Sequence, residues 1–300
     1  MQALEAIRKS IGTADDLQSV VKTMKGVAAA NIRQFERAVE SLADYARTVE
    51  LGLQVLLGSR PERLAAPTQD EPGTLGAVIF GSDQGLCGRF NVQIAERAAA
   101  QVREQSGGSD PRLLLVGTRV APLLGAEGLG IDEQVAPATS LSEIGPLVRD
   151  VLMRIEAWRS VGAVDRVILL YNESLGGALY RPRTQRLLPV DTEWFDDLRG
   201  REWPSRCLPI FTLAWEEMFS SLIREHFWVS LFRASAESLA SENASRLASM
   251  QAAERNIEER LKDLNRHYRL SRQNAITEEL LDIISGFEAL AADVREGGRA

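Results

Sequence analysis

The stretch ERNIEERLKDLNRHYR, residues 254–269, decides the fold, because its apolar residues recur at alternating steps of three and four. These positions are Ile257, Leu261, Leu264 and Tyr268. Such spacing is typical of one face of an α-helix. No proline interrupts the chain from about Trp215 to Ala292. The pattern therefore predicts one long C-terminal helix over 212–292, followed by a tail at 293–300.

A second long apolar stripe lies near the N-terminus. It consists of Leu17, Val21, Met24, Ala28, Ile32, Phe35, Val39, Leu42, Ala46, Val49, Leu53 and Leu56. The mean step is about 3.5 residues, the period of a left-handed coiled coil. Gly58 can cap this helix and Pro61 cannot continue it, which predicts a helix over 1–58. Two narrow stripes can cover one another as an antiparallel pair, and an ordinary helical bundle is the alternative.

The middle of the chain has a different pattern. Short apolar runs at 76–82, 112–118 and 165–173 are bounded by turns, and helical patterns at 91–105 and 143–160 separate them. Strands that alternate with helices indicate a mainly parallel, Rossmann-like α/β domain, here over 74–200. RLLPV at 186–190 adds an edge strand, because Pro189 is poorly tolerated in a central one. The fold class is thus an α/β insert between two long terminal helices that form an antiparallel coiled coil.

Composition narrows the classes of function. The net charge of -7 argues against nucleic acid as a partner. No stretch reaches the roughly 18 apolar residues that a membrane span needs, so we expect no direct membrane insertion. The two cysteines and two histidines have no metal-ligand spacing. We therefore expect no metal, no cofactor and no catalytic residue in this chain.

The turn FGSDQGLCGRFN at 80–91 tests the last expectation, because phosphates often bind where a strand enters a glycine-rich turn before a helix. Its glycines, Gly81, Gly85 and Gly88, do not fit Gly-x-Gly-x-x-Gly, and Arg89 stands where a Walker loop needs lysine. The interpretation we favour is a tight strand-to-helix crossover with Asn91 as the helix cap. A nucleotide-binding α/β enzyme that uses this turn stays open as an alternative.

Four stretches together resemble a known family. They are LQSVVKTMKGVAAANIRQFERA (17–38), SDQGLCGRFN (82–91), ESLASENASRLASMQAAERNIEERLKDL (237–264) and RQNAITEELLDIISGFEAL (272–290). In this order they resemble the gamma subunits of rotary F-type ATP synthases. Gln84 and Gly26 depart from the family's usual arginine and methionine, and Asn31 departs from its usual lysine. GSDQGL resembles the version in an alternate bacterial branch of the family.

The resemblance implies a function in which this chain catalyses no reaction. It implies a central rotor shaft that couples ion flow through the membrane c-ring to ATP synthesis or hydrolysis in the alpha and beta subunits. The implied partners are the alpha, beta and epsilon subunits and the c-ring, at the cytoplasmic face of the membrane as a peripheral protein. The c-ring contacts are expected around 199–211. The structural motif residues that it marks are Asp83, Gly85, Leu86, Gly88, Asn91 and Glu242. A static coiled-coil scaffold is a further alternative.

Polar residues interrupt the apolar stripe of the C-terminal helix after Tyr268. Beyond this point the helix is apolar on more than one side. This pattern predicts that another protein surrounds this end of the helix. The resemblance places ring contacts at that level. They are Met24 and Lys25, which face an acidic loop of the beta subunit; the polar residues Arg272, Gln273, Thr277 and Glu279; and the apolar residues Ile276, Leu280, Ile283, Ile284 and Phe287. Arg272 and Gln273 form a directional catch in this interpretation. In the alternative, Met24 is merely coiled-coil core and Arg272 a solvated charge.

Overall fold

A computed structural model describes residues 2–59, 73–177 and 179–297, with side chains described over 4–285 of these ranges. The stretch PERLAAPTQDEPG at 61–73, whose prolines and glycine predict a linker, lies almost wholly outside the described residues. Two helices account for much of the chain, α1 (Gln2–Gly58) and α6 (Trp215–Gly297). The chain divides into two compact units, a helix-pair unit (1–26 and 250–300) and a sheet unit (27–249), and each is described by itself.

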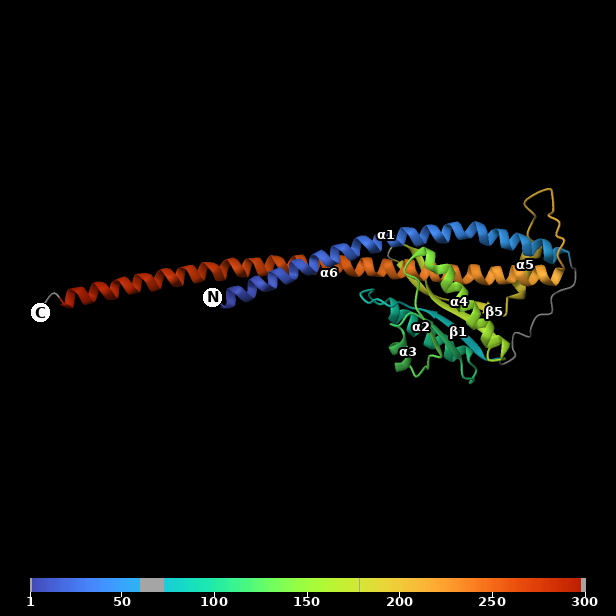
Figure 1. Ribbon diagram of the computed structural model, residues 1–300, viewed down its shortest axis with the longest axis horizontal. Helices are drawn as coiled ribbons and strands as arrows, with labels where there is room; N and C mark the ends of the chain where they lie inside the picture. Colours follow the sequence, from blue (N-terminus) through green and yellow to red (C-terminus); the bar gives the residue numbers. More distant parts are fainter. Residues whose placement is uncertain (1, 60–72, 178, 298–300) are drawn as a thin grey trace. The chain divides into compact units, whose positions relative to one another are not determined.

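The sheet unit is built on one five-stranded sheet in the order β3-β2-β1-β4-β5. Figure 1 labels β1 and β5 of this sheet. The strands are β1 (Leu75–Phe80), β2 (Arg112–Val116), β3 (Glu133–Val135), β4 (Arg166–Gly176) and β5 (Leu179–Leu188). β1 pairs in parallel with β2 and β4, and only β5 is antiparallel. The expected parallel α/β domain is present. The predicted edge strand is also present, and it is longer than expected because it forms a hairpin with β4.

The short helices of the sheet unit are α2 (Phe90–Gln105), α3 (Ala121–Ala126), α4 (Leu141–Ser160) and α5 (Thr192–Gly200). α2 and α3 pack on one face of the sheet and α4 on the other, whereas α5 packs on α1. Along β1, Ala77 and Ile79 pack with the core under α2 and α3, whereas Val78 and Phe80 pack with the core under α4 and α6. This alternation follows from the two-residue period of a strand. Helices on both faces of a mainly parallel sheet are the expected α/β architecture.

Within the sheet unit the two long helices contribute to the same core. Phe35 of α1 and Leu231 of α6 are fully buried in the cluster that contains the strands β1, β2 and β4. A second cluster joins Val49, Leu53 and Leu57 of α1 to α5. The sheet is therefore attached to this part of the helices by continuous apolar packing.

The helix-pair unit holds α1 and α6 together through a narrow seam. Val21 of α1 and Met250 of α6 are buried, and Ile257 and Leu261 are half-buried. Leu17 is 52% exposed, which differs from the stripe predicted from the sequence, and the neighbouring Gln18 is the half-buried residue instead. α6 also continues to Gly297, past the predicted end at 292. No proline precedes Gly297 there, so nothing in the sequence forces the helix to stop earlier.

Candidate functional site

The glycine-rich turn after β1 leads into α2, but Asn91 does not cap that helix. The cap position is Arg89, and Asn91 lies inside the first turn of α2. Its amide oxygen accepts a hydrogen bond from the Ser82 backbone N–H at 3.1 Å, and its amide nitrogen donates to the Ser82 hydroxyl at 2.8 Å. The predicted cap is therefore wrong: the Asn91 amide, which can donate and accept at once, ties the two ends of the turn together.

Close approach within the chain explains two of the three glycines of this turn, Gly81 and Gly88. A Cβ at Gly81 would lie 2.4 Å from a methyl carbon of Val120. Gly88 has a φ of +56°, and a Cβ there would lie 3.2 Å from the hydroxyls of Ser245 and Ser249 on α6. Gly85 has nothing closer than 3.9 Å. Gly88 is thus needed for the turn to lie against α6, and no phosphate is required to explain it.

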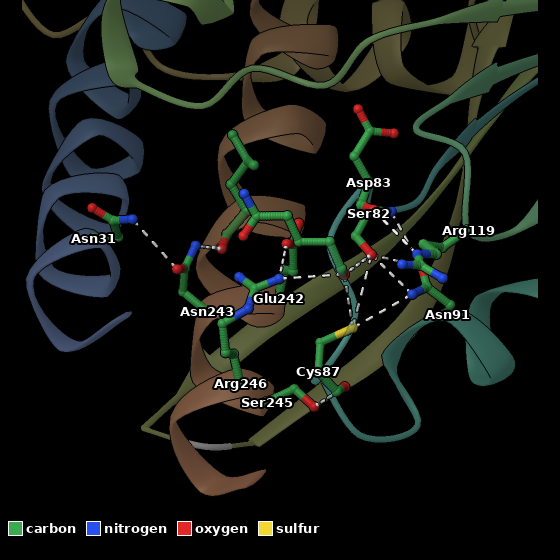
Figure 2. A network of polar contacts seen from close by, with 12 residues as sticks. Asn31, Ser82, Asp83, Cys87, Asn91, Arg119, Glu242, Asn243, Ser245 and Arg246 are labelled. Carbon is green, nitrogen blue, oxygen red and sulfur yellow. Dashed lines mark hydrogen bonds and ion pairs between the residues drawn. The ribbon is translucent and has the colours of Figure 1, made fainter. Parts of the chain in front are cut away.

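α6 binds the carbonyl groups of the turn directly, as Figure 2 shows for its side chains. The Ser245 hydroxyl donates to the Cys87 carbonyl at 2.6 Å, and the Arg246 guanidinium donates to the Gln84 carbonyl at 3.4 Å. Arg246 also pairs with Glu242, one helical turn away, at 2.5 Å. We call this contact between the 81–91 turn and residues 242–249 of α6 the junction.

The junction buries a pair of opposite charges. Glu242 and Arg246 are each only 7% exposed. Burial raises the pKa of Glu242, and the Arg246 guanidinium opposes that rise. Arg246 keeps a buried Nε atom without a hydrogen-bond partner. A buried pair with incomplete hydrogen bonding fixes geometry more than it adds stability.

Three further hydrogen bonds extend the junction. The Asp83 carboxylate accepts from the Thr118 backbone N–H at 2.8 Å, and the Asp83 carbonyl accepts from Arg119 at 3.2 Å. Asn31 of α1 donates to Asn243 of α6 at 3.4 Å. Leu86, with a φ of +62°, points its side chain into solvent. The turn is therefore held on several sides by its own chain.

Sequence reasoning missed several members of the junction, namely Ser82, Asn243, Ser245 and Arg246. The available signal was the serine- and alanine-rich run ESLASENAS at 237–245. Residues 238–246 are all buried, so this segment of α6 is covered on every side. A run of small residues within a helix that is otherwise rich in charge indicates that other segments pack close to its backbone.

The second candidate site lies in the helix-pair unit, where Lys25 has a partner within the chain. Its ammonium donates to the Glu254 carboxylate at 2.5 Å, and Met24 beside it is half-buried. Glu254 did not figure among the predicted contact residues. The contact of Lys25 with an acidic loop of another subunit would have to compete with this pair.

The predicted ring contacts do not share one level. Arg272 lies about 27 Å farther along α6 than Glu254 at a rise of about 1.5 Å per residue. The structure therefore separates Met24 and Lys25 from Arg272 and Gln273, and the expectation of a single level is wrong. The cause is the antiparallel pairing, which sets Lys25 opposite Glu254.

Arg272 and the residues that follow it form an exposed segment of α6. We call residues 270–285 the tip. Leu280 is 55% exposed and Ile284 is 53% exposed. The tip also exposes Leu270, Arg272, Gln273, Ile276, Thr277, Glu279, Leu281 and Ile283. The side chain of Phe287 lies outside the described residues.

Among the described residues no group of three or more histidine, cysteine or acidic side chains is placed to hold a metal ion. In the same part of the chain, no helix combines the length and apolarity of a membrane span. Burial raises the pKa of the Cys87 thiol, so this cysteine is not an activated nucleophile.

Comparison with known proteins gives consistent matches over nearly the whole chain. The family model described as ATP synthase matches residues 3–290. The ATP synthase gamma chain of Desulforamulus reducens is 29% identical over 294 residues, which are 97% of this chain and 100% of that protein.

Solved structures agree on the fold. The chain resembles one in the rotor of the Euglena gracilis mitochondrial ATP synthase with a TM-score of 0.63 at 17% identity, over 92% of this chain and 99% of that one. It resembles one in the central stalk and c-ring of the Tetrahymena thermophila enzyme with a TM-score of 0.55 at 23% identity, over 78% and 99%. Long terminal helices around an α/β sheet are therefore an architecture that these rotor chains share.

Proposed function

The chain belongs to the ATP synthase family as a gamma subunit, and from this premise we propose how it works as the central rotor shaft. The shaft couples ion flow through a membrane c-ring to ATP synthesis or hydrolysis in a head of alpha and beta subunits. The chain itself transmits torque and carries no catalytic group. Nucleotide chemistry takes place in the head.

The observation that carries this proposal is the exposed tip of α6. Leu280, Leu281, Ile283 and Ile284 are each more than half exposed, and together they spread over about 160° of the helix surface at about 100° per residue. Exposed apolar surface of this extent marks a binding site. An apolar face wider than the roughly 100° stripe of an ordinary surface helix is normally enclosed by neighbours on more than one side. A ring of subunits around the tip supplies such an enclosure and leaves the shaft free to turn.

The junction is the complementary part of the proposal. A shaft has to pass torque to whatever its α/β domain contacts, which requires the sheet to follow α6. The buried Glu242–Arg246 pair and the Ser245 hydroxyl bind the turn after β1 to α6. Hydrogen bonds with fixed directions resist sliding in a way that apolar packing alone does not.

We propose contacts with the head at two levels. Arg272 and Gln273 at the tip form directional hydrogen bonds with groups of the ring and act as a catch at defined angles. Met24 and Lys25 meet an acidic loop about 27 Å away along the helix axis, by the same rise of about 1.5 Å per residue. At this second level the loop's carboxylate competes with Glu254 for the Lys25 ammonium.

The sheet unit makes the contacts with the c-ring and the epsilon subunit in this proposal. Residues 201–214, between α5 and α6, expose Leu208 and Ile210, the latter to 94%. We place the contacts with the c-ring at 199–211 and those with the epsilon subunit on the α/β domain. This puts the protein at the cytoplasmic face of the membrane as a peripheral subunit.

Co-purification with alpha and beta subunits tests the proposal. A tip variant, Leu280→Ser with Ile283→Ser and Ile284→Ser, should lose most of the complex because its apolar surface is gone. A matched control changes three exposed apolar residues of the sheet unit, Val161→Ser, Leu175→Ser and Leu179→Ser. The wild type and the control should elute with both partner subunits. Equal assembly of the tip variant and the control would contradict the enclosed tip.

The two alternatives give different results. A nucleotide-dependent enzyme would bind ATP as the isolated chain, with saturation and one site per chain. A static scaffold would not require alpha and beta subunits for its stable complex. Either result would replace the rotor assignment.

A further inference from the structure

A groove on the sheet unit, separate from both the junction and the tip, has the features of a small-molecule site. It lies between α1, α6 and the first residue of α4, Leu141, and encloses about 930 Å³. Pockets of roughly 300–1,000 Å³ are typical of sites for small ligands. The volume is therefore sufficient for a molecule with two fused rings.

One wall of the groove is a row of aromatic side chains. The rings of Trp228 and Phe232 have centroids 5.0 Å apart at 31°, and Tyr45 meets Trp228 edge-on at 6.1 Å. All three line the groove, and the Tyr45 ring is 43% exposed. Aromatic faces of this kind stack on planar ligands.

The lining of the groove also carries positive charge from α1. Arg33 and Arg37 lie one turn apart on α1, are exposed and line the groove. No ion pair involves either guanidinium within the described ranges 2–59, 73–177 and 179–297. The one acidic residue of the lining, Glu225, already accepts a hydrogen bond from the Tyr45 hydroxyl at 2.7 Å. Two guanidiniums thus remain available, and their planar donor forks suit a carboxylate, sulfonate or phosphate.

We propose that this groove binds a small planar aromatic anion. Its ring system stacks on Trp228 and Phe232, and its anionic group bonds Arg33 and Arg37. Charge complementarity selects the anion, since no other acid of the lining neutralises the two arginines. The aromatic wall selects a flat ring over an aliphatic chain.

Calorimetric titration of the full chain with naphthalene-2-sulfonate tests this site. We expect saturable binding with one ligand per chain. The double substitution Arg33→Gln with Arg37→Gln should weaken it by about tenfold or more, since each charge-assisted bond contributes. The matched control, Arg8→Gln with Arg47→Gln, removes the same charge from exposed positions of α1 outside the groove and should bind like the wild type.

Two further ligands separate the roles of charge and ring. Hexanesulfonate keeps the anion without the ring, and 2-naphthalenemethanol keeps the ring without the anion, so both should bind at least about tenfold more weakly. Absence of saturable binding would overturn the proposal. Equal affinity of the Arg33/Arg37 variant and its control would also overturn it, with circular dichroism showing that both are folded.

Discussion

The junction and the tip both belong to α6, yet they treat polar and apolar side chains in opposite ways. At the junction, Glu242 and Arg246 are buried and paired within the chain. At the tip, Leu280 and Ile284 are exposed although they are apolar. The junction is complete within the chain, whereas we propose that surrounding subunits complete the tip. In this proposal one continuous helix serves both as a fixed attachment and as a bearing surface.

Mutations at the junction and at the tip should have different consequences. Changes at the junction should appear as lost stability of the isolated chain, because its partners lie within the chain. Changes at the tip should leave that stability unaltered and appear only in the assembled complex.

The largest expected effect is at the junction. Arg246→Ala leaves the Glu242 carboxylate buried without its partner, which should cost about 3–5 kcal/mol of unfolding free energy. Urea denaturation of the isolated chain measures this loss. Replacing both residues, Glu242→Leu with Arg246→Met, removes both charges and should recover much of the stability. A single mutant as stable as the wild type would show that the pair is not buried in solution.

A smaller effect is expected at the tip, in catalysis by the complex. Arg272→Ala with Gln273→Ala removes directional bonds, and the charge-assisted bond of Arg272 is worth roughly 1.5–3 kcal/mol, so ATP hydrolysis should slow by about tenfold to a hundredfold. The control Gln251→Ala with Arg255→Ala changes the same residue types at exposed positions of α6 that precede the tip in the sequence. Its turnover should stay near that of the wild type.

The same tip variant should unfold in urea like the wild type. Gel filtration of each preparation establishes that the complex has formed. Unchanged turnover in the assembled double mutant would show that Arg272 is a solvated charge and that these two residues do not form a catch.

A third effect depends on pH and concerns Glu237 of α6 in the sheet unit. Burial raises the pKa of this carboxyl to about 7, and the nearby Glu173 carboxylate adds to the rise, while Arg233 and Arg183 oppose it. One of its carboxyl oxygens is buried without a hydrogen-bond partner. Because the folded state holds the proton more tightly than the unfolded state, stability is fully present below about pH 4.5 and falls as pH rises through about 7.

Glu237→Gln should therefore stabilise the chain at pH 8 and not at pH 5. The gain at pH 8 should be about 1–2 kcal/mol after allowance for partial solvent screening. Glu279→Gln at the exposed tip is the matched control, and its unfolding free energy should equal that of the wild type at both pH values. A gain that is equal at both pH values would contradict the titration of Glu237.

The smallest expected effect is none at all. Gln84→Arg restores the residue common in the family, and its side chain lies in solvent beside the turn. Calorimetry with ATP should detect no binding by the isolated chain in either form. Saturable ATP binding that this substitution abolishes would mean that the turn is a nucleotide site and not part of a structural junction.

The sequence predicted the long elements well because their patterns are long. The stripe of α6 and the runs of β1, β2 and β4 each depend on many residues, so local exceptions do not obscure them. Leu17 is such an exception, since its neighbour Gln18 lies at the seam. The three-residue strand β3 and the short helices α3 and α5 were missed, because few residues carry their patterns.

The contacts between distant segments could not be predicted from spacing. Nothing in the sequence pairs Lys25 with Glu254 or Ser245 with Cys87, which depend on the register between elements. Asn91 shows the same limit at short range. Its residue type favours a cap, but the geometry of the turn sets its amide beside Ser82 instead.

A single-molecule measurement tests directly whether the shaft rotates within the head. Cys207 is exposed, whereas Cys87 is buried with a raised pKa, so a maleimide-biotin will attach a bead to this subunit at Cys207 of an alpha–beta–gamma complex prepared without the c-ring, which we place against 199–211. With the alpha–beta head fixed to a surface, the account predicts that ATP drives the bead in one direction in discrete angular steps. A bead that only fluctuates, in a complex that hydrolyses ATP, would contradict the account.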